Sequence, residues 1–219
     1  MKFTVDCRSC HRLAGFLDQV RGTHPDYYAL PVSSFGEPRS PFLVVGLAPG
    51  MHGANRTGRP FTGDFAGNLL YGSLHKYGFS SSAEPLDAAG NANPSLHLKG
   101  CRITNAVRCL PPQNKPEPGE IRACNGYVAE ELAILPQGAA ILALGTIAHQ
   151  AVLMALQLRK SSFVFGHGAQ HELPGGLTLF DSYHCSRYNT QTKRLTTAMF
   201  ETVIGDIAAH LVGARFIAP

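Results

Sequence analysis

The sequence predicts an α/β protein in which helices cover both faces of a parallel sheet. Short, continuously apolar segments, typical of buried parallel strands, alternate along the chain with segments whose apolar residues recur at helical spacing. No internal repeat, linker or low-complexity block interrupts this alternation. A chain of 219 residues is long enough for a full hydrophobic core. We therefore expect residues 1–219 to form one domain.

Four apolar segments are the expected strands, and they lie at residues 42–45, 102–107, 140–144 and 177–180. Glycine or small polar residues mark the carboxyl ends of these segments. They are Gly46, Asn105, Gly145 and Ser182. Open parallel sheets bind ligands beyond the carboxyl ends of their strands. The sequence therefore predicts a binding site at this edge of the sheet.

The remaining periodic segments are the expected helices. They lie at residues 8–21, from Asp64 onward, and at 118–135, 146–158 and 192–212. Asp64 is suited to cap the amino end of its helix. Residues 22–40 and 78–98 are rich in turn-forming and small residues, so we expect loops there.

Composition excludes several classes of protein. Hydrophobic residues make up 44% of the chain and charged residues 16%, which excludes a disordered polyelectrolyte. The net charge of +4 favours anionic partners without a histone-like coat. Five cations are expected to gather on one surface. They are Arg56, Arg59, Arg187, Lys193 and Arg194.

No apolar run approaches the roughly 18 residues of a membrane span, and the amino end does not resemble a secretory signal. We expect a cytoplasmic protein with reduced thiols, in which six cysteines indicate metal before disulfides. Four of them form a spaced set. They are Cys7, Cys10, Cys109 and Cys124. Such a set suits a tetrahedral zinc ion or an iron–sulfur cluster, and buried small hydrophobes are the structural alternative. Cys101 and Cys185 do not fit the set.

A glycine-rich turn follows the first expected strand. Residues 46–50 read Gly-Leu-Ala-Pro-Gly, without the spacing of either common nucleotide-binding loop. Short polar and basic residues crowd the next fourteen positions, and Phe61 stands among them. Its ring is placed either to stack on a flat ligand or to anchor the loop in the core. His167 and His171 could form a metal pair, although a surface loop is the favoured interpretation.

Four blocks together resemble the uracil-DNA glycosylase superfamily, most closely its iron–sulfur branch known as family 5 or type B. They are residues 46–50 continuing to Gly-Arg-Pro-Phe-Thr-Gly-Asp at 58–64, Thr-Asn-Ala-Val-Arg-Cys at 104–109, Leu-Gly at 144–145, and Ser-Tyr-His-Cys-Ser-Arg-Tyr-Asn-Thr at 182–190. The resemblance implies a central four-stranded parallel sheet in a three-layer α/β/α fold. It also implies a [4Fe-4S] cluster held by the four spaced cysteines.

The resemblance also implies what the site does. The enzyme would flip a deaminated base, uracil and possibly hypoxanthine, out of DNA and hydrolyse its N-glycosidic bond. Phe61 would stack on the base and Asn105 would read its polar edge, in a pocket completed by Gly46 and Ala48. His184 would donate a hydrogen bond to the oxygen that gains charge. The expected DNA contacts are Pro49, Gly50, Ser186, Arg187, Tyr188 and Asn189, with Arg187 and Tyr188 as candidates for the wedge that fills the vacated stack.

Two positions depart from the pattern of the wider superfamily. Its other glycosylases carry an acidic or amide residue in the first turn, where this chain has Leu47 and Ala48, as in the type B family. The resemblance points to Asp64 as the carboxylate that takes over, either stabilising the sugar cation or orienting water. Cys185 stands where many relatives have proline, which is expected to loosen the loop.

Two alternatives remain open from the sequence. One is a nucleic-acid-binding module that a metal or a cluster stabilises, without catalysis. The other is an electron-transfer protein, in which the cluster itself carries the electrons. The favoured interpretation is a monomeric glycosylase that acts on double-stranded and single-stranded DNA.

Overall fold

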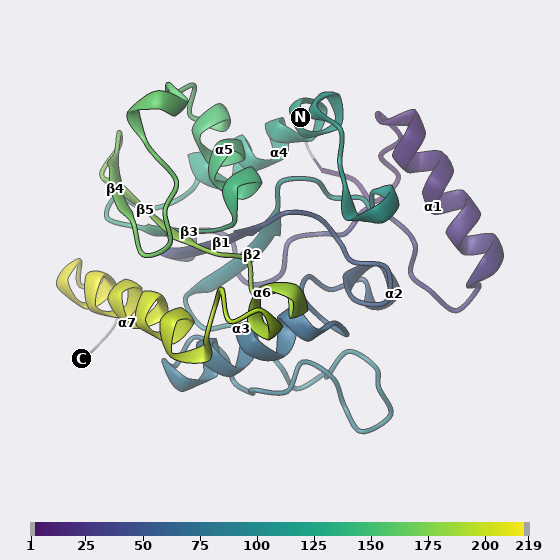
Figure 1. The fold of residues 1–219 in the computed structure, drawn as a ribbon, viewed down its shortest axis with the longest axis horizontal. Helices are drawn as coiled ribbons and strands as arrows, with labels where there is room; N and C mark the ends of the chain where they lie inside the picture. Colours follow the sequence, from purple (N-terminus) through teal and green to yellow (C-terminus); the bar gives the residue numbers. More distant parts are fainter. Residues whose placement is uncertain (1–2, 217–219) are drawn as a thin grey trace.

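The computed structural model describes residues 3–216, and five strands form its central sheet (Figure 1). The strands are β1 (Phe42–Gly46), β2 (Cys101–Asn105), β3 (Ala140–Leu144), β4 (Gln170–Leu173) and β5 (Leu177–Ser182). Their order across the sheet is β2-β1-β3-β5-β4. The four expected strands are all present and pair in parallel. The predicted α/β class is therefore confirmed, and the count of four strands is corrected to five by an antiparallel edge strand, β4.

Seven α-helices are assigned among residues 3–216. They are α1 (His11–Thr23), α2 (Ala54–Thr57), α3 (Phe65–Lys76), α4 (Pro118–Ala133), α5 (Thr146–Ala155), α6 (Arg187–Gln191) and α7 (Thr197–Gly213). Short 3-10 turns occupy Pro112–Asn114 and Lys160–Ser162. The last helix begins at residue 197 rather than 192, because Thr196 caps it by accepting a hydrogen bond from the Met199 amide.

Alternation along β1 explains why helices cover both faces of the sheet. Phe42 and Val44 point to the face that α3 and α7 cover, whereas Leu43 and Val45 point to the face under α4 and α5. All four side chains are fully buried. Figure 1 shows α4 and α5 above the sheet and α3 and α7 below it. A sheet buried on both faces needs continuously apolar strands, which is the pattern that the sequence shows.

The strand register brings the expected site segments to one edge. Gly46 pairs with Asn105, and Leu144 pairs with Ser182, so four strand ends lie side by side. The segments that follow β1, β2 and β5 leave the sheet at this edge. Chain regions more than a hundred residues apart therefore meet there.

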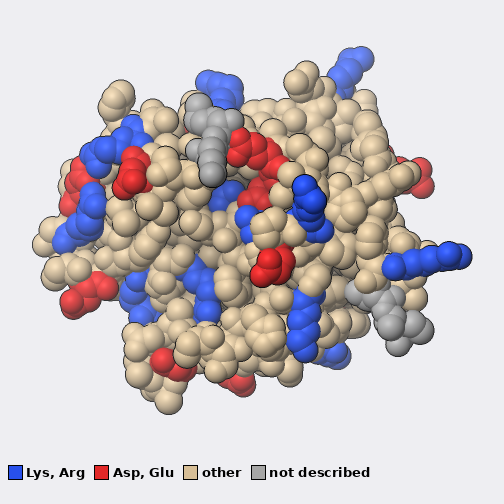
Figure 2. All heavy atoms as spheres, turned by 180° about the vertical axis from the view of Figure 1, so that it is seen from behind, with Lys and Arg blue, Asp and Glu red and all other residues tan. Residues whose placement is uncertain are grey.

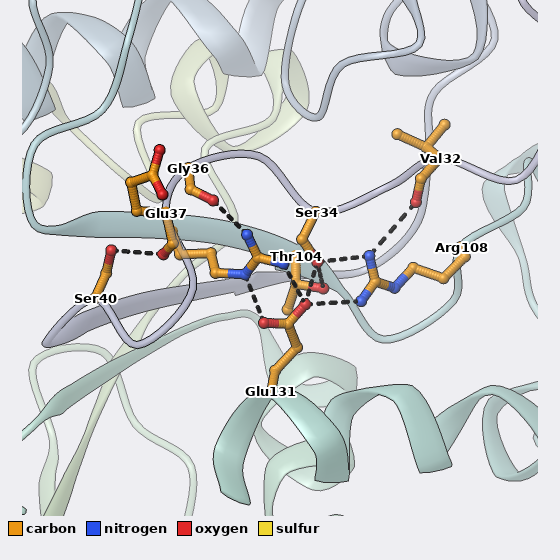
Figure 3. Close-up of polar contacts among 9 residues, drawn as sticks. Val32, Ser34, Gly36, Glu37, Ser40, Thr104, Arg108 and Glu131 are labelled. Carbon is orange, nitrogen blue, oxygen red and sulfur yellow. Dashed lines mark hydrogen bonds and ion pairs between the residues drawn. The ribbon is translucent and has the colours of Figure 1, made fainter. Parts of the chain in front are cut away.

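A buried polar network fixes the β2 side of this edge (Figure 3). The Glu131 carboxylate on α4 accepts hydrogen bonds from Arg102, Arg108 and Ser34. The hydroxyl groups of Ser34 and Thr104 are also hydrogen-bonded to each other, with their oxygens 3.1 Å apart. Arg108 is only 3% exposed, and it follows the end of the strand that carries Asn105. The network thus joins β2, α4 and the loop before β1.

None of the helices in residues 3–216 combines the length and the apolar character needed to cross a bilayer.

Candidate active site

A cavity of about 510 Å³ opens at the carboxyl edge of the sheet. Eight residues expected to form the site line it. They are Ala48, Gly50, Phe61, Asp64, Asn105, His184, Ser186 and Arg187. They come from the turn after β1, the loop that leads into α3, the end of β2 and the segment after β5. The fold therefore brings together the segments that the sequence analysis selected.

Gly46 lies where Asn105 and Phe61 approach the backbone most closely. A Cβ atom at Gly46 would lie 2.4 Å from Asn105 Oδ1 and 2.7 Å from Phe61 Cζ. No ordinary Cβ contact is that short, so any side chain here would displace one of the two groups. Gly46 thus contributes to the site by leaving space.

Phe61 is held in an unusual backbone conformation. Its φ of +51° lies in the left-handed region, which is uncommon for a bulky residue, and its carbonyl oxygen lies directly against Gly67. The neighbouring Pro60 carbonyl accepts a hydrogen bond from the buried Tyr71 hydroxyl at 2.9 Å. The Phe61 ring lines the cavity, stacked on His184 with centroids 6.0 Å apart. Phe61 is thus buried, at 7% exposure, and also faces the cavity, so stacking on a ligand stays a prediction.

Asp64 is a helix cap and a cavity residue at once. Its Oδ1 accepts a hydrogen bond from the Gly67 amide at 3.0 Å, which caps α3 as predicted. Its Oδ2 lies against Gly53, where a Cβ atom would approach it to 2.4 Å. Burial raises the pKa of Asp64, although the amide hydrogen bonds oppose that shift. One carboxylate oxygen is thus committed to the helix, and the side chain also lines the cavity.

His184 lines the cavity after β5, in the neutral form. Burial lowers the pKa of His184 to about 4, so its imidazole is uncharged near pH 7. The Asn189 amide donates a hydrogen bond to the His184 carbonyl oxygen at 2.8 Å, which fixes the backbone here. A neutral imidazole still has one N–H to donate.

Asn105 has a buried carboxamide oxygen with no hydrogen-bond partner within the described chain. The residue is 3% exposed and lines the cavity. Burying an acceptor without a partner costs free energy, so such an atom commonly receives its hydrogen bond from a ligand or water. The cavity thus contains an acceptor suited to a polar ligand edge.

The structure does not bring the other expected DNA contacts into the cavity lining. Pro49 is buried and has no N–H to donate, so its expected DNA contact gains no support. Asn189 turns its amide toward the His184 carbonyl, which is a positioning role. Tyr188 is 70% exposed on α6 and remains placed for a wedge.

Sequence reasoning missed several lining residues, and Asn114 is the most informative. It belongs to the Pro-rich segment after β2, with a φ of +55° in a 3-10 turn. The lining also includes Leu47, Met51, His52, Gly53, Ala54, Phe65 and Ala66. Proline at positions 111, 112 and 116 marked this segment as a constrained loop. Nothing in the local sequence shows that the loop folds back over the strand edge.

The four spaced cysteines surround a second, smaller cavity near α1 and α4. Cys7 and Cys10 are partly buried, and Cys109 and Cys124 are buried. Arg12 on α1 pairs with Glu120 on α4 at 2.7 Å beside them. Cys101 and Cys185 lie elsewhere, fully buried in the core between the sheet and α3 and α7. The structure thus places the four spaced cysteines around one cavity and the other two apart from it, and the ligand role of the four stays a prediction.

The donor chemistry of these four side chains suits either a zinc ion or an iron–sulfur cluster. Four thiolates around one zinc ion at about 2.3 Å would lie about 3.8 Å apart. Among residues 3–216, no three of these sulfurs lie within 4.8 Å of one another. Burial and the neighbouring thiols raise the pKa of Cys109 to about 12 and that of Cys124 to about 11. A bound cationic centre would remove that penalty on the thiolates.

The expected basic surface is only partly present. Arg56 donates to the Gly90 carbonyl oxygen at 2.9 Å, and Arg59 donates to the carbonyl oxygens of Asn93 and Pro85. Both guanidinium groups thus hold the loop before β2. Figure 2 shows the face opposite to that of Figure 1, where basic and acidic side chains are interspersed. The net charge of +4 therefore does not produce a continuous basic coat on this face.

The α/β fold and the cavity at its strand edge define a family. A family model of the uracil DNA glycosylase superfamily matches residues 33–208. The chain therefore belongs to the uracil-DNA glycosylase superfamily, which confirms the resemblance carried by the four sequence blocks.

Individual relatives extend this result across nearly the whole chain. The chain is 49% identical over 212 residues to a type-5 uracil-DNA glycosylase of Thermus thermophilus, covering 94% of each protein. It is 40% identical to a type-5 uracil-DNA glycosylase of Mycobacterium bovis, covering 94% of this chain and 78% of that protein. A type-5 uracil-DNA glycosylase of Pyrobaculum aerophilum is 34% identical, with 94% and 89% covered.

Proposed function

We propose that this chain is a DNA-repair glycosylase that excises uracil by hydrolysing the N-glycosidic bond, leaving an abasic site. The observation that carries the proposal is one cavity that combines an aromatic ring, an unpaired carboxamide oxygen, a neutral imidazole and a carboxylate. Relatives named as type-5 uracil-DNA glycosylases support it over most of the chain. Hypoxanthine is proposed as a second substrate, because a volume of about 510 Å³ has room for a purine.

The base must be flipped out of the duplex before it is recognised, because the glycosidic bond cannot be reached while the base is stacked. Phe61 offers the ring on which the flipped base stacks. The unpaired Asn105 oxygen accepts a hydrogen bond from a base N–H, and its amide group can donate to a base oxygen. Gly46 lets both groups lie this close to the strand end.

Charge separates as the glycosidic bond breaks: the sugar becomes cationic and the base anionic. His184 donates a hydrogen bond to the base oxygen that gains negative charge, and being neutral it acts as a donor rather than as a source of a proton. Asp64 supplies negative charge for the sugar cation and an acceptor for the attacking water. Its Gly67 hydrogen bond fixes the carboxylate in place before DNA binds.

An iron–sulfur cluster is proposed on the four spaced cysteines. Cys7 and Cys10 precede α1, Cys109 follows β2 and Cys124 lies in α4, so a bound cluster would join these segments. A bound cluster would cross-link these segments. Base release itself needs no redox step. Reduced thiols are required for such ligands, which agrees with a proposed cytoplasmic location.

DNA is proposed to approach the cavity beside α6. Ser186 and Arg187 line the cavity rim, and the exposed Tyr188 ring follows them. Ala48 and Gly50, in the turn after β1, line the same cavity. Double-stranded and single-stranded DNA are both proposed substrates, with the enzyme acting as a monomer.

The test is base release from labelled duplexes that contain uracil or hypoxanthine opposite each normal base. Wild-type protein is expected to leave abasic sites in uracil DNA, and Asp64→Asn is expected to lose about 100-fold or more in kcat. The amide oxygen of Asn can still cap α3, so the variant should stay folded. Asp206→Asn, an exposed change on α7, is the matched control.

Binding of uracil DNA without any base release by the wild type would refute the glycosylase and favour the binding module. Full activity in folded Asp64→Asn would refute the role of that carboxylate. Purified protein should also show the broad visible absorbance of an iron–sulfur cluster. Stoichiometric zinc on the cysteines in its place would overturn the cluster.

A further inference from the structure

A cluster of three metal-ligating side chains lies outside both sites described above. His149 stands on α5, His171 on β4 and Asp181 on β5. One potential ligand atom from each lies within 4.8 Å of the other two, and no other group of three does so in residues 3–216. None of the three lines the proposed base-binding cavity. The favoured interpretation of His171 as a surface-loop residue is corrected, because it lies in a strand and faces Asp181.

The hydrogen-bond partners of His149 require more protons than a neutral imidazole has. Its Nδ1 lies 2.8 Å from Asp181 Oδ1, and its Nε2 lies 3.0 Å from the Phe163 carbonyl oxygen. An ionised carboxylate and a carbonyl both only accept, whereas a neutral imidazole carries one N–H. Two arrangements satisfy both acceptors: a protonated imidazole, which Asp181 favours by raising the pKa of His149 against the effect of burial, or a metal ion at Nδ1 with Nε2–H donating to the carbonyl. Metal-binding histidines commonly make that outer hydrogen bond.

Asp181 presents one oxygen to each histidine. Its Oδ2 lies 3.2 Å from His171 Nε2, and the Gly166 amide donates to the same oxygen at 3.4 Å. The donor set is therefore two imidazole nitrogens and one carboxylate, with an amide that orients the carboxylate. Imidazole and carboxylate ligands together suit zinc among the common divalent ions.

The surroundings of the cluster are apolar on two sides and reachable on a third. The Phe165 ring packs edge-on against His149, and the Phe163 ring packs edge-on against His171. A cavity of about 310 Å³ is lined by His149 and Phe163, so this side of the cluster lies next to open space. Asp181 is fully buried, and each of its two carboxylate oxygens faces one of the histidines.

We infer that His149, His171 and Asp181 form a structural site for a divalent transition-metal ion, with zinc as the ion of choice. The ion would join α5 and the edge hairpin of β4 and β5 (Figure 1). β4 is short and mostly polar, so it gains little from apolar burial. Asp181 stands three residues before His184, so the ion would also stiffen the strand end that delivers the neutral imidazole.

Metal content of the full protein tests this site. Protein purified with its iron is treated with a chelator, titrated with Zn²⁺ at neutral pH, and assayed for zinc and iron in the same sample. Wild type is expected to bind about one zinc ion per chain. His171→Asn keeps an N–H that can donate to Asp181 but lacks the imidazole, so zinc affinity should fall at least about 10-fold. Iron content should stay unchanged, which separates this site from the cysteines.

His97→Asn, a change at an exposed histidine in the loop before β2, is the matched control and should keep its zinc. A second measurement needs no variant. Zn²⁺ at about 100 times its Kd should raise the wild-type Tm by about 5–10 °C, and Co²⁺ should give visible bands that zinc displaces. Equal zinc uptake in wild type and His171→Asn, or no Tm shift and no cobalt bands in the wild type, would overturn the site. Neither result depends on base excision.

Discussion

Glu131 is the residue whose loss should most destabilise the β2 side of the active site. Its carboxylate accepts two hydrogen bonds from Arg102, at 2.6 and 3.0 Å, and one from Arg108 at 3.3 Å. The three side chains are only 9%, 16% and 3% exposed. Glu131→Gln would therefore leave two largely buried cations facing a neutral amide.

The expected cost follows from this burial. Removing one partner of a buried ion pair typically destabilises a protein by about 3–5 kcal/mol, because the remaining charge stays desolvated. For a chain of this size that corresponds to a fall in Tm of about 6–20 °C. The assay is urea and thermal unfolding followed by far-UV circular dichroism. The exposed control Asp206→Asn should change the stability by no more than about 0.5 kcal/mol.

A second substitution distinguishes charge burial from lost packing. Arg108→Met alone should destabilise the wild type, but in the Glu131→Gln background it should recover stability, since it removes an uncompensated charge. If Glu131→Gln costs less than about 1 kcal/mol, or if the two substitutions simply add, the network is not a coupled ion cluster and the reasoning fails.

The pH dependence of the same variant has a defined sign. Burial alone would raise the pKa of Glu131, but the hydrogen bonds from Arg102 and Ser34 and the two guanidinium charges outweigh it and lower the pKa. A carboxyl group with a lowered pKa in the folded state stabilises the protein above its unfolded pKa, near 4.5. This contribution is lost as the pH falls through the folded value. The difference between wild type and Glu131→Gln should therefore be full at pH 6–8 and shrink below about 4.5.

Three further predictions concern the proposed chemistry. His184→Gln should lower kcat on uracil DNA about 100- to 1000-fold, and the wild-type rate should show no loss assignable to protonation of His184 until the pH approaches its pKa of about 4. Gly46→Ala should abolish most base release while far-UV circular dichroism stays native, because the new methyl group would displace Asn105 or Phe61; unchanged kcat/KM would contradict the close approach. Cys124→Ser should lower the bound iron and the Tm together, and a variant with full iron content would remove this residue from the proposed ligands.

Most of the fold could be predicted because the strands are buried on both faces. The segment at residues 140–144 is apolar at every position, which distinguishes it from a strand with one face in solvent. The strand in the structure has the same bounds. The sequence did not predict β4, because this edge strand has polar, partly exposed residues. They are Gln170, His171 and Glu172. The glycines at positions 175 and 176, both with positive φ, were the available sign of a hairpin.

The site was predictable to the extent that its residues stand directly at strand ends. Asn105 ends β2 and His184 comes two residues after the end of β5, and parallel pairing places these strand ends at one edge. Asn114 belongs to a loop whose path depends on distant packing, which no local pattern shows. Asn189 is polar and belongs to the sequence block that contains His184. Its side-chain amide nevertheless donates a hydrogen bond to the His184 carbonyl oxygen, so it is not available to a ligand. Residue type and spacing indicate where a site lies, but the direction of each side chain depends on its tertiary partners.

The distribution of arginines shows how a weakly charged chain can still hold DNA. Arg56 and Arg59 donate hydrogen bonds to backbone carbonyls of the loop before β2, so they tie that loop to the segment that carries Phe61. Arg187 stacks over the Phe65 ring at the cavity rim, and Arg194 stacks over Tyr183, next to His184. Positive charge near the site is thus concentrated in the segment after β5, beside the groups proposed to act on the base. A few well-placed cations give a modest salt dependence, which suits an enzyme that must release undamaged DNA and move on.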